Sequence, residues 1–259
     1  MQFEGRRLLR QTSLYICLGI LVLMVFVSAF STYSMVKLMG EDASTAIMLA
    51  SGLSPGDLMC GKGYLISAAG SSSLLMLFGI AAALYFCADY TGGTLKNIIG
   101  RGNSRSSVFL TNQAYVMVMG LIFGVICWLS GLFFGSLFWG LGKNWDVSAI
   151  LRQLLLQMLV MWAFGAFYSF WSVLVRKTGW AVALCILTPG LISTMAALLD
   201  IFTTKKDFLV SNYWLTSCLT YASTPGAGAE DVSRSILVAL AWFILFCLGG
   251  WLISRRQDV

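Results

Sequence analysis

Side chains that carry out catalysis are scarce in this sequence. The 259 residues include no histidine, which removes Ser–His hydrolases, HExxH metalloproteases and nearly all zinc sites. The run from Gly56 to Gly63 has the spacing of a Walker A motif, with Gly61 and Lys62 in place. It ends in glycine, however, where the motif needs Ser or Thr to hold magnesium. We therefore expect no enzymatic activity, metal or bound cofactor in this chain.

One segment has the pattern of a binding element. Leu95, Ile98 and Ile99 follow one another at i, i+3 and i+4, so they share one face of a short helix. Thr94 can cap the start of this helix, and the glycines at 100 and 102 can end it. Either Ser104 or Ser106 can then cap the element that follows. Residues 89–106 are thus predicted to be a loop with a short amphipathic helix.

The elements around this loop must lie in lipid. Of all residues 58% are hydrophobic and 11% are charged, whereas a soluble domain has roughly half and about a quarter. The apolar residues form long uncharged blocks, most of which match the roughly 20 residues of a membrane-spanning helix. We predict an all-α membrane protein with one transmembrane domain over residues 1–259 and six spans, at about 14–35, 64–88, 107–139, 154–175, 179–199 and 236–253.

The third block is unusual because its 33 residues are too many for one crossing and too few for two. We count it once and expect a break near Ser130 and Gly131. The block also contains two Gly-x-x-x-Gly pairs, Gly120 with Gly124 and Gly131 with Gly135. Such pairs allow close helix approach. Packing inside one bundle is the favoured interpretation, and a seam between two copies is the alternative.

The remaining segments are predicted to lie at the membrane surfaces. The basic residues near the amino terminus suit an interfacial helix on anionic headgroups. Within the connection 200–235, the apolar stretch 208–221 is too short to cross the membrane, so it should form a re-entrant pair of short helices. Pro189 should kink the fifth span. Cys60 and Cys218 fall in connections on the same side, where a disulfide between them is possible.

Charge distribution predicts the orientation. The amino tail, the 89–106 loop, the turn at Arg176 and Lys177 and the carboxyl tail hold ten Lys and Arg residues, against seven on the opposite side. The positive-inside rule therefore places both termini in the cytoplasm. The net charge of +6 is explained by this asymmetry, and we expect no nucleic-acid partner. The apolar blocks carry no charged residue at depth, which argues against proton or sodium coupling.

The loop also carries a specific resemblance. Gly93-Thr94-Leu95-Lys96-Asn97, with Ser104-Arg105 leading into the third span, resembles the pattern of permease subunits of type-2 ABC exporters. The detailed similarity covers about 20 residues, while the six-span layout is compatible over nearly the whole chain. Two positions depart from the pattern: Asp89 stands where the family more often has Glu, and Asn112 where a Lys is frequent.

The resemblance implies a role for the loop as the coupling helix that sits in a groove of a separate ABC ATPase. Two copies of that ATPase would bind ATP and Mg²⁺, and a second permease, identical or related, would complete the path. The bilayer would be a bacterial plasma membrane, and the cargo an amphipathic peptide, as in export of, or immunity to, antimicrobial peptides. The coupling residues would be Thr94, Leu95, Lys96, Asn97, Ile98, Ile99, Arg101, Ser104 and Arg105, and the interfacial helix would include Phe3, Arg6, Arg7 and Arg10.

Two other functions fit the same residues. The chain could be a structural or regulatory membrane subunit that transports nothing and binds a partner through this loop. It could also be an uncoupled secondary carrier or a channel. A neighbouring reading frame with a complete Walker A motif would favour the exporter over both.

Overall fold

The structure is a computed structural model that describes residues 11–39, 60–91, 104–142, 146–202, 209–224 and 229–256. Every regular element in these ranges is a helix. Six helices are long and apolar enough to cross a membrane, which confirms the predicted six-span, all-α fold. They are α2 (Thr12–Met39), α6 (Ser72–Thr91), α8 (Arg105–Trp139), α9 (Val147–Val175), α10 (Thr178–Phe202) and α12 (Ala229–Arg256).

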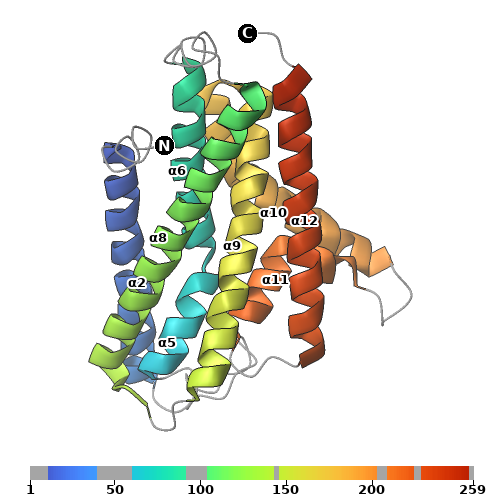
Figure 1. Cartoon of the computed structure of the whole chain (residues 1–259). Coiled ribbons are helices and arrows are strands. Elements are labelled where there is room, and N and C mark those ends of the chain that lie inside the picture. Colours follow the sequence, from blue (N-terminus) through green and yellow to red (C-terminus); the bar gives the residue numbers. More distant parts are fainter. Residues whose placement is uncertain are drawn as a thin grey trace.

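Helix α9 is the centre of the bundle. It packs against α6, α8, α10 and α12 and against two short helices, α5 (Gly61–Ser67) and α11 (Leu215–Ala222). Within their most apolar stretches, 67% of the residues of α6 and α9 are buried, against 17% for α10 and α12. The start of α2, the end of α6, the start of α8 and the end of α12 all lie at one end of the bundle (Figure 1). The helices thus alternate in direction around α9, with α10 and α12 outermost.

The second predicted span is not one helix. The block 64–88 begins as α5, tightens into the 3₁₀ turn η1 (Ala68–Gly70), breaks at Ser71 and resumes as α6. Ser71 is extended, with φ −70° and ψ 134°, as is usual for a serine that precedes a helix. Only Ser72–Thr91 qualifies as a span. The predicted start of this span at 64 was wrong, because a run without charges does not show where one helix ends and the next begins.

The expected break near Ser130 and Gly131 was also wrong, since α8 is a continuous helix of 35 residues. Gly131 and Gly135 instead allow α5 to pack closely against α8. A Cβ added to Gly131 would lie 2.6 Å from the backbone oxygen of Tyr64, and one on Gly135 would lie 2.6 Å from the Tyr64 Cβ. The intramolecular interpretation of this Gly-x-x-x-Gly pair is therefore the correct one. At a rise of about 1.5 Å per residue, α8 is about 52 Å long.

Helix ends differ from the predicted limits where polar caps extend the helix. Helix α9 begins at Val147, not at 154, because Asp146 caps it. The Asp146 carboxylate accepts hydrogen bonds from the Ser148 hydroxyl and from the N–H groups of Ser148 and Ala149. The Ser148 hydroxyl, and then the Ala149 N–H, lower the pKa of Asp146. The predicted loop 89–106 is likewise shorter, since α6 continues to Thr91 and α8 begins at Arg105.

The connection before α12 contains two short helical elements, as predicted. They are the 3₁₀ turn η2 (Val210–Tyr213) and the eight-residue α11. Asp200 of α10 accepts hydrogen bonds from the backbone N–H groups of Val210 and Ser211, which holds η2 beside the end of α10. Neither Cys60 nor Cys218 is in a disulfide, so the possible bond between them does not form. Cys60 instead accepts the Gly63 N–H and caps α5.

The contact between α5 and α8 predicts the effect of Gly131→Ala. The added methyl group meets a backbone atom, which cannot rotate away, so the free energy of unfolding should fall by about 1–3 kcal/mol. The matched control is Gly19→Ala in α2, where nothing lies within 4 Å of the added Cβ. In that control the free energy of unfolding should rise by up to about 1 kcal/mol, because alanine favours a helix more than glycine does. Thermal unfolding of both variants in detergent checks this, and equal shifts would contradict the contact.

Candidate functional site

The residues on which the resemblance rests are only partly described. Ser104 and Arg105 lie at the start of α8, where the Ser104 hydroxyl accepts a hydrogen bond of 3.2 Å from the Ser107 N–H. Ser104, and not Ser106, is therefore the cap. The other predicted coupling and interfacial residues lie outside the described ranges: Thr94, Leu95, Lys96, Asn97, Ile98, Ile99, Arg101, Phe3, Arg6, Arg7 and Arg10.

A buried polar contact joins the two helices that flank this segment. The side-chain amide of Asn112 in α8 donates a hydrogen bond of 2.8 Å to the carboxyl group of Asp89 in α6. Asp89 is 1% exposed and Asn112 is 3% exposed. A hydrogen bond to a carboxyl group in such surroundings is stronger than one in water. These are the two positions at which the sequence departs from the exporter pattern, and the structure places them in contact.

Aromatic packing extends the same contact to α12. The rings of Phe86 and Phe109 lie 6.0 Å apart and bring α6 against α8. Gly250 of α12 lies over Phe109 so closely that a Cβ there would come within 2.8 Å of the ring. The end of α6, the start of α8 and the last third of α12 therefore form one packed unit at the end of the bundle that carries the 92–103 segment.

A second polar centre, which the sequence analysis missed, lies in α9. Gln157 is fully buried, and its amide nitrogen donates to the carbonyl oxygens of Ile66 at 2.8 Å and Ala222 at 3.0 Å. Its oxygen accepts a hydrogen bond of 2.7 Å from the Trp128 indole. Ile66 and Ala222 lie at the ends of α5 and α11, whose last carbonyls have no partner within their own helices. One side chain thus joins two short helices to α8 and α9.

Three further side chains near Gln157 also donate hydrogen bonds to backbone carbonyl groups. Gln153, one turn before Gln157, donates to the Thr224 carbonyl at 2.7 Å, just after α11. The Trp214 indole at the start of α11 donates to the carbonyl of Pro189 at 3.3 Å. The Trp242 indole of α12 donates to the Tyr213 carbonyl at 2.9 Å. The available signal was a pair of glutamines one turn apart at the start of an apolar block.

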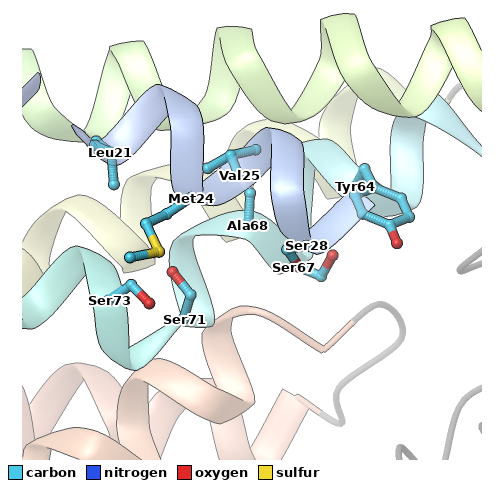
Figure 2. Close-up of a pocket in the computed structure, with 9 residues that line it drawn as sticks. All are labelled: Leu21, Met24, Val25, Ser28, Tyr64, Ser67, Ala68, Ser71 and Ser73. Atoms are coloured by element: carbon cyan, nitrogen blue, oxygen red, sulfur yellow. The ribbon is translucent and has the colours of Figure 1, made fainter. Parts of the chain in front are cut away.

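A cavity of about 130 Å³ lies between α2 and the break in the second block. Figure 2 shows α2 on one side, with Leu21, Met24 and Val25, and the broken segment on the other. Hydroxyl groups dominate the polar part of its lining, which comes from Ser28, Tyr64, Ser67, Ser71 and Ser73. Among the described residues, no three cysteine or acidic side chains gather closely enough to hold a metal ion. This geometry suits uncharged hydrogen-bonding groups.

The fold and these polar centres define a multi-pass helical membrane protein with a broken second span. Residues 58–259 match a protein family described as "Protein of unknown function (DUF2705)". The match covers most of the chain, and the chain therefore belongs to this family. It includes α5, the break and every later helix, and it leaves out α2. A comparison with curated proteins found no match.

The Gln157 contacts predict a large cost for Gln157→Leu. Two buried carbonyls and the Trp128 indole lose their partners, which should lower the free energy of unfolding by about 2–5 kcal/mol. The matched control is Gln113→Leu in α8, whose buried amide makes no hydrogen bond within the described residues. In that control the free energy of unfolding should stay the same or rise, because the substitution removes a buried polar group that makes no such bond. The midpoints of thermal unfolding in detergent distinguish them, and similar losses in both would contradict the role of Gln157.

Proposed function

We propose that this chain is the transmembrane permease subunit of an ATP-driven exporter. The resemblance over residues 89–105 supports this proposal, as do the six spans. The distribution of Lys and Arg supports a cell membrane location with both termini in the cytoplasm. The helix ends that flank the 92–103 segment lie at the same end of the bundle as the end of α12 (Figure 1), which agrees with that orientation.

One observation carries the mechanism: the buried hydrogen bond from Asn112 to Asp89. It ties the last turn of α6 to the second turn of α8, on either side of the proposed coupling segment. A force that an ATPase applied to the segment would therefore act on both helices together. Since α6 and α8 both pack against α9, movement of the pair would be transmitted to the centre of the bundle.

The proposed cargo is a hydrophobic or amphipathic peptide. The apolar blocks that form the six spans carry no Asp, Glu, Lys or Arg, so they offer no charged partner to a charged substrate. Energy would come from two ATPase subunits with their own ATP and Mg²⁺. A second permease, either identical or related, would complete the path. Leu95, Ile98 and Ile99 would fill a groove of the ATPase, while Lys96, Arg101 and Arg105 would meet acidic residues at its rim.

The first test is charge reversal in the segment. The triple variant Lys96→Glu, Arg101→Glu and Arg105→Glu should weaken copurification of the ATPase by at least about tenfold, since opposed charges become like charges. The matched control reverses Lys177 and Arg255 at the same end of the bundle and should leave copurification unchanged. Unchanged binding of the triple variant would remove the assigned contact and favour a subunit that transports nothing.

The second test asks whether the Asp89–Asn112 contact transmits movement from the ATPase to the helix bundle. Asn112→Leu has a similar side-chain size and removes the donor to the Asp89 carboxyl group, so it should loosen the contact between α6 and α8. ATPase copurification should persist, while peptide-stimulated ATP hydrolysis in reconstituted vesicles should fall several-fold. Asn112→Lys restores attraction to Asp89 and should keep the stimulation. Equal stimulation in both variants would show that the Asp89–Asn112 contact transmits nothing.

A further inference from the structure

The cavity beside α2 gathers serine hydroxyls that the protein itself leaves without partners. Four serines line it: Ser28 of α2, and Ser67, Ser71 and Ser73 of the broken segment. Within the described residues, none of these four hydroxyls makes a hydrogen bond. The fifth hydroxyl of the lining, that of Tyr64, differs because it has a hydrogen-bond partner in the Thr32 side chain. The cavity therefore presents a cluster of free hydrogen-bonding groups.

These hydroxyls are accessible to an occupant of the cavity. Ser67, Ser71 and Ser73 are only half-buried and Ser28 is exposed, so protein atoms do not seal them off. Figure 2 shows the side chains of Ser71 and Ser73 pointing toward α2. Ser28 lies well inside the span Thr12–Leu38, where lipid offers no hydrogen-bond partner. A polar group without a partner is costly there, which favours an occupant that supplies one.

The helix break adds backbone groups with the same need. The first N–H groups of a helix have no acceptor within that helix, and α6 begins at Ser72. The N–H of Leu74, the third residue of α6, donates to the Ser71 carbonyl at 3.2 Å. The N–H groups of Ser72 and Ser73 come before it, and Ser73 lines the cavity. The occupant must therefore accept hydrogen bonds as well as donate them.

Size and charge restrict the occupant further. The cavity measures about 130 Å³, and at roughly 30 Å³ for each molecule it has room for about four waters. Its described lining contains no acidic or basic side chain, so an ion would enter without a counter-ion. The remaining walls are apolar, with Leu21, Met24 and Val25 on α2. Water fits these conditions because it is small and uncharged, and because it both donates and accepts hydrogen bonds.

We propose that the cavity beside α2 binds a cluster of about four ordered water molecules, which bond to the hydroxyls of Ser28, Ser67, Ser71 and Ser73. These waters hydrate the helix break inside the membrane and connect it to α2. The site goes beyond the exporter function and does not depend on it, since water binding needs no ATPase, second permease or cargo.

Radiolytic footprinting of the full chain in lipid nanodiscs tests for the water directly. X-ray pulses turn bound water into hydroxyl radicals, which oxidise a neighbouring methionine to its sulfoxide. Met24 lines the cavity and is 46% exposed, whereas Met195 of α10 is 62% exposed and is not part of the lining. Mass spectrometry should show Met24 oxidised several-fold faster than Met195. If exposure at the protein surface set the rate, Met195 would react at least as fast, and that result would overturn the site.

Filling the cavity should remove the signal. Ser73→Leu places an apolar side chain where the waters bind, so oxidation of Met24 should slow several-fold. The matched control is Ser72→Leu, which changes the adjacent residue in the same turn of α6 but not the lining of this cavity. It should leave the Met24 rate unchanged. Equal Met24 rates in the two variants would count against the water cluster.

A stability measurement keeps the proposal testable without footprinting. If water bonds to the Ser67 hydroxyl, Ser67→Ala should lower the midpoint of thermal unfolding in nanodiscs by about 2–4 °C. In a dry cavity the same change should leave the midpoint unchanged or raise it, because alanine favours a helix more than serine does. The control Ser31→Ala alters an exposed serine of α2 outside the lining and should not lower the midpoint. A midpoint that Ser67→Ala leaves unchanged or raises would show that no water binds there.

Discussion

A helix that ends inside a bilayer leaves carbonyl groups where water cannot reach them, and lipid offers no donor. The fold depends on side chains that donate hydrogen bonds to such carbonyl groups. Helices α5 and α11 both end beside α9, and the amide of Gln157 donates to a carbonyl at the end of each. The Gln157 oxygen in turn accepts the Trp128 indole N–H, so both polar atoms of this side chain have partners. Without such a side chain, these two buried carbonyl groups would lose their donor.

Other features of the bundle follow from the same requirement. Tryptophan indoles supply donors to the carbonyls of Pro189 and Tyr213, at the Pro-containing helix and the end of η2. Gly131 and Gly135 remove the side chains that would keep α5 away from α8. Polar atoms are consequently concentrated around the break and the short helices, while the outer surfaces of α10 and α12 remain apolar. The cavity beside α2 lies in this polar region.

The sequence predicted the long helices well, since runs of about 20 uncharged residues have few alternatives to spanning a membrane. It also located the short helices before α12, because the 208–221 stretch is too short to cross. It failed at residues 67–73, where serines and small residues are apolar enough to hide a break in a hydrophobic run. Serine in such a run can face a neighbouring helix or cap a new one, and only tertiary contacts decide between them. The partners of Gln157 were equally hidden, because they are 65 and 91 residues away.

The unbroken course of α8 has a mechanical consequence. A straight helix of about 52 Å exceeds the roughly 30 Å hydrocarbon layer by about 20 Å, so it reaches beyond the bilayer on at least one side. Because α8 is unbroken, a rigid tilt of about 10° about one end would move the other end by about 9 Å. Because α5 packs against Gly131 and Gly135 near the other end of α8, it would move with that end. Small rotations near Ser104 would thereby become large displacements at the opposite membrane surface.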